Sequence, residues 1–322
     1  MKEEILNLDR NTSTGYDGVS AIFLIECADE LCYPLSAIYN LSVESGEYPS
    51  VLKFNNIIPI YKNNGEKSSI ESYRPISIQP VISKLFERIV NSALRNHVKN
   101  MICDQQHGFC RNKSTTSNLL CYTDFISTAF DDGFQVHSIY TDFSKAFDTV
   151  SHSHLLLKME NYFGISNTDL KWFRSYLQDR FQRVVLHGFQ SDWSPVFSGV
   201  PQGSILGPML FIMYVNDMPS CLRSSNCLLF ADDIKIFKRI SCEKDCLDLQ
   251  KDLSYFCDWC TKWNLKLNID KCFSIDFSLK RVFSCNYAYT VFSSTLQQVH
   301  QVKDLGVFFL LTICRSLYTS RK

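Results

Sequence analysis

The stretch LLFADDIKIF, residues 228–237, decides the fold, because two adjacent acids interrupt an otherwise apolar run. The flanking residues are typical of two buried β-strands, and Lys235 is expected to extend its amine to solvent. Burying one unpaired carboxylate is costly, and Asp232 and Asp233 would also repel each other. Ala-Asp-Asp is not a favoured two-residue hairpin sequence either. The doublet therefore indicates that the two acids have a chemical role, because folding alone does not explain them.

A second acidic strand end lies upstream, in IYTDFSKAFDTV, residues 139–150. Asp142 ends an apolar strand there, and Asp148, six residues further on, also fits a simple turn or cap. Carboxylates from separate strands repel unless a hard cation such as Mg2+, which prefers oxygen ligands, lies among them. Two such ions can stabilise the attacking and leaving oxygens of a phosphoryl transfer. A metal-dependent phosphohydrolase is an alternative, but no water-activating base accompanies these motifs.

A third motif is SGVPQGSILGP, residues 198–208. Its glycines allow the backbone to approach a ligand or another chain closely, and its prolines stiffen the turn. The loop leads into an apolar helix, whose first N–H groups would face a ligand or chain that lies beside the loop. Taken by itself, the motif predicts a loop more clearly than it predicts a ligand.

The amino-acid composition limits the classes of protein to which the chain can belong. The chain has 322 residues, 45% of them hydrophobic and 20% charged, which predicts an ordinary globular fold. Its 33 basic and 33 acidic residues cancel. Lys53–Lys113 nevertheless holds ten basic residues against four acidic ones, which fits either phosphate contacts or a solvated face.

The cysteines and the apolar runs indicate the compartment. Fourteen cysteines without a signal peptide predict free thiols in a reducing compartment. A zinc site is an alternative for the cysteines at 242, 246, 257 and 260, although their spacing also suits one amphipathic helix. No apolar run reaches the ~20 residues that span a bilayer, so a soluble protein is expected.

The pattern of elements favours an α+β fold. Apolar periodicity and turn signals predict helices and strands without regular βαβ spacing. The expected helices cover 20–45, 81–98, 115–130, 152–163, 167–179 with Asn167 or Thr168 as N-cap, 209–218 and 245–262. The expected strands and hairpins cover 56–62, 73–80, 136–143, 180–199 with a turn at Gly188, 228–237, 265–277 and 305–311.

Together the three motifs resemble the core of reverse transcriptases from non-LTR (LINE-type, jockey-like) retrotransposons. YTDFSKAFDTV, SGVPQGSILGP and FADD occur in the order and spacing of that family. Further matches include IIPIYKNNGEKSSIESYRPISI, DQQHGFCRNKSTTSNLL, WNLKLNIDKC and VKDLGVFF, so the resemblance extends from about Gly15 to Phe309. It implies an RNA-directed DNA polymerase that transfers a nucleotide from a dNTP to a primer 3′-OH.

The resemblance also implies a right-hand polymerase fold, with an antiparallel palm sheet packed on helices, fingers and a largely missing thumb. The LGVFF segment matches the hairpin that grips the primer. The implied parts are an N-terminal helical extension (1–52), fingers (53–130), palm with the first acid (131–160), a fingers–palm connection (161–198), palm (199–310) and a stub where a thumb would begin (311–322).

Site residues follow from the same resemblance. The implied metal ligands for two Mg2+ ions, with Mn2+ as a substitute, are Asp142, Asp232, Asp233 and the carbonyl of Phe143. The implied dNTP contacts are Lys62, Arg74, Gln202, Gly203 and Phe147, whose ring would exclude a ribose 2′-OH, and Lys271 would protonate the leaving pyrophosphate.

The resemblance leaves some questions open. It implies an RNA template, a DNA primer and dNTPs as partners, no membrane, and a location in the nucleus, the cytoplasm or both. Whether other proteins of the element bind the chain is undetermined. The alternative is a truncated remnant of an element that binds nucleic acid but is inefficient or inactive in catalysis.

Overall fold

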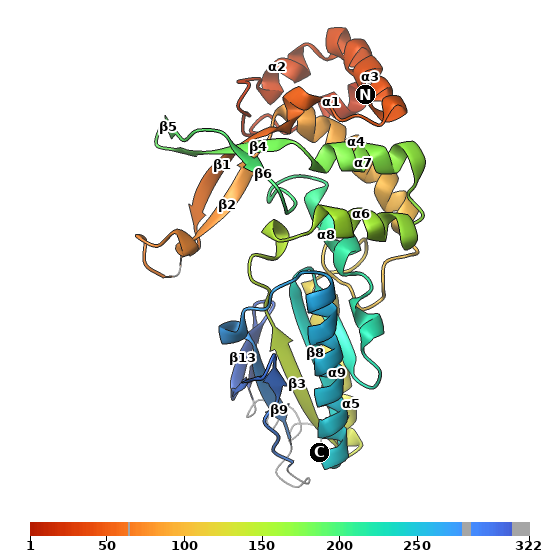
Figure 1. The fold of residues 1–322 in the computed structure, drawn as a ribbon, viewed down its shortest axis with the longest axis vertical. Coiled ribbons are helices and arrows are strands. Elements are labelled where there is room, and N and C mark those ends of the chain that lie inside the picture. Colours follow the sequence, from red (N-terminus) through yellow and green to blue (C-terminus); the bar gives the residue numbers. More distant parts are fainter. Residues whose placement is uncertain (64, 279–284, 311–322) are drawn as a thin grey trace. The chain divides into compact units, whose positions relative to one another are not determined.

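The structure, a computed structural model, describes residues 1–63, 65–278 and 285–310 of the chain (Figure 1). It is a mixed α and β structure, as the sequence predicted. The chain forms two compact units, each built from two separate segments. The first unit is Met1–Met101 with Phe147–Tyr214, and the second is Ile102–Ala146 with Val215–Lys322. The stub predicted at 311–322 lies outside the described residues.

The first unit combines helices with a sheet of order β2-β1-β4-β5, in which β6 also pairs with β4. Strand β1 is antiparallel to β2 and parallel to β4. Its helices are α1 (Lys2–Leu6), α2 (Ala21–Glu26), α3 (Ala28–Ser45), α4 (Val81–Val98), α6 (His152–Asn161), α7 (Asn167–Leu177) and α8 (Gly207–Val215). Short 3-10 turns cover Ser50–Lys53, Ile70–Ser72 and Ala146–Asp148, and the strands are β1 (Phe54–Tyr61), β2 (Tyr73–Ile78), β4 (Arg180–Leu186), β5 (Phe189–Gln190) and β6 (Ser194–Val196).

Two sequence predictions about this unit were wrong in detail. The single helix expected over 20–45 is two helices, because Cys27 leaves the helical backbone between α2 and α3. A one-residue break hardly disturbs the apolar periodicity, so the pattern did not indicate it. The N-cap of α7 is Ser166, whose backbone is extended, and the predicted Asn167 is already the first helical residue.

An aromatic cluster forms the core of the first unit. Tyr39 of α3 stacks on Phe86 of α4 with ring centroids 4.0 Å apart, and Trp172 stacks on Tyr176 along α7 at 5.6 Å. Tyr48 meets Trp172 edge-on. Aromatic rings bury large apolar areas and lock one another's orientation. This cluster therefore fixes α3, α4 and α7 with respect to one another.

The second unit is built around a five-stranded sheet of order β12-β9-β3-β8-β7. Strands β9, β3, β8 and β7 are antiparallel to their neighbours. The strands are β3 (Gln135–Thr141), β7 (Asn226–Phe230), β8 (Asp233–Ile240), β9 (Phe273–Phe277), β10 (Thr290–Val291), β11 (Ser294–Thr295), β12 (Gln297–Gln298), β13 (Gln301–Asp304) and β14 (Val307–Leu310). The helices are α5 (Thr115–Asp131) and α9 (Glu243–Lys262), with 3-10 turns at Met218–Cys221 and Ile269–Lys271.

The two faces of this sheet carry different partners (Figure 1). On one face, Tyr122 of α5 packs with Val136, Phe237 and Ile275 of the central strands. On the other face, Cys246 of α9 lies beside His137. Both faces are covered, so nearly every residue of β3 is buried and burial does not alternate along the strand.

The cysteines are free thiols in the part of the chain that the structure describes, as expected. Cys246 lies 3.3 Å from Cys285, a residue outside the predicted zinc set, while Cys257 and Cys260 are buried. Within the described ranges, no three His, Cys, Asp or Glu side chains form a metal-holding group. The zinc alternative therefore has no support in the described residues. Nor does any described helix have the length and apolar character that crossing a bilayer requires.

Asp276 of β9 makes the second unit sensitive to pH. Burial raises the pKa of Asp276 to about 7, and its Oδ1 has no hydrogen-bond partner in the described part of the chain. The neighbouring His137 does not compensate its charge, because burial lowers the pKa of His137 to about 4. An unfolded Asp titrates at ~3.9, so between that pH and about 7 the folded protein keeps a proton that the unfolded chain has released. The free energy of unfolding therefore falls as the pH rises towards 7.

We therefore expect Asp276→Asn to stabilise the protein at pH 8 by on the order of 3 kcal/mol. The gain should shrink steadily below pH 7 and vanish near pH 4, where the carboxyl is protonated in both states. Urea unfolding of parent and variant at several pH values measures it. A gain that is equal at pH 4 and pH 8 would show that the carboxyl charge is not the cause.

Candidate active site

The three predicted acids come together at one end of the sheet in the second unit. Thr141 of β3 pairs with Ile234 of β8, so the next residue along each strand places Asp142 opposite Asp233. Both acids belong to the face of the sheet on which α5 packs, because side chains alternate along a strand. The pairing of β3 with β8, which the sequence could not specify, therefore brings the motif of Asp142 and the motif of Asp233 side by side.

Asp232 lies in the turn between β7 and β8. Phe230 pairs with Asp233, so the turn has two residues, Ala231 and Asp232. Ala231 has a φ of +56°, which is unfavourable for a residue with a Cβ and explains why this sequence is not a common hairpin turn. Its N–H donates to Oε1 of Gln106 at 3.0 Å, and this contact holds the strained turn in place. Strain held by a neighbouring side chain is typical of functional sites.

The electrostatics show that the acids affect one another. Loss of hydration, followed by the charges of Asp232 and Asp142, raises the pKa of Asp233 to about 6. Asp233 keeps contact with solvent, although protein atoms crowd around it. Burial, together with the Asp142 charge, likewise raises the pKa of Asp232. A cation placed among the three acids would relieve both effects.

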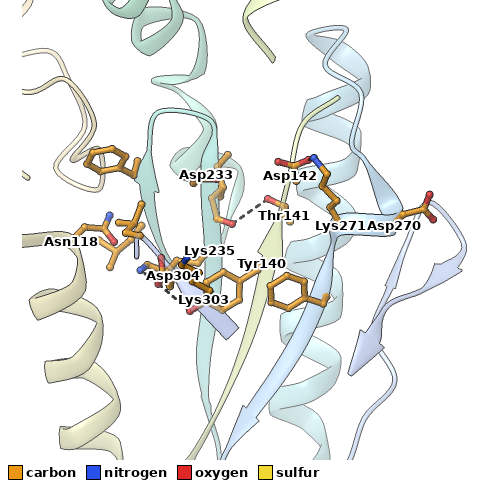
Figure 2. Close-up of a pocket in the computed structure, with 15 residues that line it drawn as sticks. Asn118, Tyr140, Thr141, Asp142, Asp233, Lys235, Asp270, Lys271, Lys303 and Asp304 are labelled. Carbon is orange, nitrogen blue, oxygen red and sulfur yellow. Dashed lines mark hydrogen bonds and ion pairs between the residues drawn. The ribbon is translucent and has the colours of Figure 1, made fainter. Parts of the chain in front are cut away.

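Lys271 is the cation that already faces these acids. Its Nζ lies 3.2 Å from Oδ2 of Asp142, and Figure 2 shows the two side chains pointing towards each other. The Lys271 side chain is 65% exposed, so this ion pair contributes little to stability. The structure thus places Lys271 beside Asp142, and its role as a proton donor stays a prediction.

Phe143 is fixed by the segment that precedes Lys271. Its ring is buried, and its backbone forms an antiparallel bridge with Leu267. The flanking hydrogen bonds run from Ser144 N to Lys266 O and from Asn268 N to Asp142 O, both at 2.8 Å. The backbone next to Asp142 is therefore held rigidly, as a carbonyl ligand would require.

A hollow of about 370 Å³ opens beside these acids. Asp142, Asp233 and Lys271 line one part of it, and Tyr140, Lys235 and Asp304 line another (Figure 2). Both positive and negative side chains therefore border a space large enough for part of a nucleotide, and the negative charge is concentrated at the ends of β3 and β8.

The donor chemistry fits a hard divalent cation. Three carboxylates supply only oxygen atoms, the ligands that Mg2+ prefers. Burial first, and then the charges of neighbouring acids, raise the pKa values of Asp232 and Asp233. The described side chains do not enclose an ion as they stand, since Asp142 faces Lys271. The residues thus match the ion in type and charge, and the Asp142–Lys271 pair is the contact that an ion would replace.

The predicted dNTP residues lie in the first unit. Lys62 directly follows β1, and Arg74 of β2 pairs with Ile60, so the hairpin brings the two exposed cations onto neighbouring strands. Lys62 Nζ donates to the carbonyl of Glu71 at 2.7 Å. The structure thus brings both predicted triphosphate cations to one hairpin.

The glycine-rich loop packs against that same hairpin. Ser77 of β2 donates its N–H to the carbonyl of Gln202 at 2.7 Å, and a Cβ at Gly203 would lie 2.8 Å from the Ser77 carbonyl. Gly203 also has a φ of +110°, so only glycine fits there. Gln202 Nε2 donates to Asp148 Oδ1, which gives Asp148 a role in holding the loop.

Phe147 lies next to this loop. Its carbonyl accepts from Val200 N at 2.8 Å, and its ring stacks on Phe211 of α8 with centroids 4.5 Å apart. The hydrogen bond holds the Phe147 backbone and the stacking holds its ring, so the ring moves only with strain. All five predicted dNTP residues therefore belong to the first unit, whereas the acids and Lys271 belong to the second.

Sequence reasoning missed two buried charged groups. Glu87 of α4 is fully buried, and its Oε2 accepts the N–H groups of Ile205 and Leu206 in the glycine-rich loop. Its spacing from Ser83 and Leu94 places it on the buried helical stripe, which was the available signal. Lys235 is also buried, paired with Asp304, so the expectation that it would reach solvent was wrong. Only the long-range fold reveals that partner.

Comparison with known proteins identifies the family of this chain. Residues 60–309 match the family model described as reverse transcriptase (RNA-dependent DNA polymerase). The chain is 32% identical over 291 residues to the "Probable RNA-directed DNA polymerase from transposon X-element" of Drosophila melanogaster, which covers 87% of this chain and 31% of that protein. It is 29% identical over 317 residues to the "RNA-directed DNA polymerase from mobile element jockey" of Drosophila funebris, covering 95% of this chain and 34% of the relative.

The sheet of the second unit thus carries three carboxylates at its strand ends, a donor set of the kind that suits a divalent cation. The chain belongs to the reverse transcriptase family, and its similarity to the jockey and X-element proteins confirms the resemblance to non-LTR retrotransposons. It spans about a third of the length of the curated relatives it matches.

Proposed function

We propose that this chain is an RNA-directed DNA polymerase of a mobile element, which extends a DNA primer along an RNA template. The observation that carries the proposal is the pairing of β3 with β8, which sets Asp142 opposite Asp233 beside the Asp232 turn. The activity requires RNA, a primer and dNTPs, so it would take place inside the cell, in the nucleus, the cytoplasm or both.

In this proposal the second unit contributes the part of the palm that carries the acids. Asp142, Asp232, Asp233 and the Phe143 carbonyl would hold two Mg2+ ions, for which Mn2+ can substitute. Bound ions would supply charge that stabilises the attacking 3′-oxygen and the leaving pyrophosphate oxygen. Lys271 already lies 3.2 Å from Asp142, so its amine is within reach of a leaving group at the same place and can donate a proton there.

The first unit would bind the incoming nucleotide. Lys62 and Arg74 lie on one hairpin, where two cations can make charge-assisted contacts with a triphosphate. Gln202 and Gly203 bring backbone to the same hairpin without a side-chain obstruction. We further propose the parts named from the resemblance: fingers at 53–130, palm at 131–160 and 199–310, and a connection at 161–198, with 1–52 as an N-terminal extension.

Primer extension by the purified 322-residue chain tests this function. The assay uses a DNA primer on an RNA template with dNTPs and either Mg2+, Mn2+ or a chelator. We expect extension that depends on the metal and follows the template sequence. Binding of the primer–template without any extension would instead support the alternative, an element remnant that only binds nucleic acid.

Phe147 would exclude ribonucleotides in this proposal. Because Phe211 supports its ring, Phe147 cannot easily turn away from a ribose 2′-OH. Phe147→Ala should therefore lower the preference for dNTP over rNTP by roughly 10- to 100-fold, with little change in dNTP incorporation. Single-nucleotide incorporation kinetics measure both rates, and Phe147→Tyr is a control that keeps the ring. Equal rejection of rNTPs by parent and Ala variant would remove this role.

A further inference from the structure

A second hollow, of about 560 Å³, lies between helices α3 and α7 of the first unit. Ile38 and Leu41 of α3 line it together with Lys171 and Arg174 of α7, and Lys53 also borders it. Within each helix these residues are three positions apart, so they lie on one face. We call this space the α3–α7 groove. In the described part of the chain, none of the predicted dNTP contacts lines it.

The two helices that form the groove are tied to each other by hydrogen bonds. Trp172 Nε1 donates to Ser42 Oγ at 3.1 Å, and Lys171 Nζ donates to the carbonyl of Ser45 at 2.9 Å. Both bonds join α7 to the C-terminal half of α3. The groove is therefore a preformed space, which lowers the entropic cost of filling it.

Lys53 is a buried cation with few partners of its own. Only 7% of the residue is exposed, and its Nζ lies 3.5 Å from Ser175 Oγ, at the outer limit of a hydrogen bond. Within the described ranges Lys53 forms no ion pair, although its ammonium group carries three donors. Burial lowers the pKa of Lys53, against the opposing charge of Asp179. A buried amine this poorly satisfied lacks an acceptor.

The rest of the groove offers a second cation and an apolar surface. Arg174 is exposed, and its guanidinium makes no hydrogen bond or ion pair with any residue that the structure describes. Ile38 and Leu41 expose 49% and 66% of their surface. A ligand that fits this groove therefore has apolar groups together with an anionic acceptor, and a carboxylate matches the fork of an arginine.

The surroundings of the groove favour a peptide over a nucleic acid. The ring of Tyr48 is only 3% exposed, so it offers no face on which a base could stack. Helices α3 and α7 both end here, at Ser45 and Leu177, with partial negative charge at their carbonyls. Glu47 and Asp179 add two full negative charges. A row of phosphates would be repelled there, whereas one carboxylate directed at a cation would not.

We propose that the α3–α7 groove binds a segment of a partner protein in which apolar side chains accompany a single Asp or Glu. The carboxylate would accept hydrogen bonds from Lys53 Nζ and the Arg174 guanidinium, and the apolar side chains would cover Ile38 and Leu41. This inference goes beyond the proposed polymerase function and does not depend on it.

Selection from a random library of 12-residue peptides supplies the probe. Peptides are selected on the 322-residue chain and then depleted on the same chain with Lys53→Met and Arg174→Gln, which removes binders of other surfaces. The surviving peptides should share apolar residues and one Asp or Glu. Their affinity for the parent chain is measured by fluorescence anisotropy of a labelled peptide.

Two changes that were not used in the selection test the binding mode. Leu41→Ser should weaken the peptide roughly 10-fold, because a buried Leu contact is lost. Replacing the acid of the peptide by its amide should weaken binding to the parent by roughly 10-fold or more, but should have little effect on Arg174→Gln, since the two changes remove one shared interaction. Lys99→Gln is the matched control, an exposed lysine of the same unit, and should bind as the parent does.

The stability of Lys53→Met tests the role of the buried amine separately. If Lys53 is kept for a ligand, Met, which preserves the apolar stem and removes the buried charge, should melt at or above the temperature of the parent. A variant that melts well below the parent would show that the amine serves folding and would overturn its role in binding.

Other outcomes would overturn the inference as a whole. These are the absence of surviving peptides, survivors without an acid, and survivors that bind Leu41→Ser as they bind the parent. A labelled 12-nucleotide single-stranded RNA is the last probe. If it displaces the peptide and itself binds Leu41→Ser and Arg174→Gln more weakly than the parent, the groove is a nucleic-acid site and the peptide proposal is wrong.

Discussion

Replacing Asp142 or Asp232 with Asn is expected to lower metal-dependent dNTP incorporation by roughly 10³-fold or more. Each carboxylate supplies a negative oxygen ligand that a carboxamide cannot replace in charge. Since Asp142 follows β3 and Asp232 lies in the β7–β8 turn, each substitution removes one side of the proposed ion site. Single-nucleotide incorporation with Mg2+ on an RNA template measures the loss.

The same substitutions should leave the fold intact. Burial raises the pKa values of Asp232 and Asp233, and the negative charge of Asp142 adds to both shifts. Removing the Asp142 charge should therefore move the pKa of Asp233 down from about 6 towards its ordinary value, without loss of melting temperature. An NMR titration of the side-chain carboxyl carbons follows this shift directly and needs no activity.

A surface acid provides the control for this prediction. Asp248 of α9 also lies in the second unit and pairs with Lys251 at 3.1 Å on the helix surface. Asp248→Asn removes the same charge at a distance from the proposed site, so incorporation should match the parent. Undiminished incorporation by Asp142→Asn or Asp232→Asn would remove the acids from the mechanism.

The acidic hairpin could be predicted from the sequence because its signal is local. The apolar run around Asp232 and Asp233 predicted two buried strands, and β7 and β8 confirm them. The strand that ends at Asp142 was predicted for the same reason. Carboxylate chemistry suggested only that the acids gather around a cation. The pairing of the two strands, in a register that opposes Asp142 to Asp233, was not predicted from the sequence.

Two features were missed because their partners are distant in the sequence. Lys235 looked like a solvated lysine, but its partner Asp304 follows 69 residues later. Glu87 lies on the buried stripe of α4, yet its partners in the glycine-rich loop lie 118 and 119 residues away. Local patterns report which face is buried, whereas the partner of a buried charge depends on how the strands and loops assemble.

The second large effect is expected at Glu87, which holds the glycine-rich loop in the first unit. Its Oε2 accepts from Ile205 N at 2.8 Å and from Leu206 N at 3.1 Å. Its Oε1 accepts from Gln79 Nε2 at 2.7 Å and from the Tyr176 hydroxyl at 2.8 Å. Four donors thus converge on one carboxyl group with no exposed surface. The group connects α4 and α7 to the start of α8.

Glu87→Ala should therefore destabilise the protein by about 3–5 kcal/mol, because four buried donors lose their acceptor at once and a cavity forms. Glu87→Gln should cost less but remain unfavourable, since its amide group presents N–H to a position where donors already lie. Urea unfolding measures both, and Glu4→Gln, at an exposed position on α1 of the same unit, is the control.

The order of these variants distinguishes the hydrogen-bonding role from simple packing. If Glu87 only filled space, Gln, which has nearly the same volume, would match the parent, and Glu87→Met would be harmless as well. If hydrogen bonds from the four donors determine the stability, Glu87→Met should destabilise the protein nearly as much as Glu87→Ala despite its larger side chain. Met accepts no hydrogen bond from Ile205 or Leu206. A Met variant as stable as the parent would contradict the loop-anchoring role of Glu87.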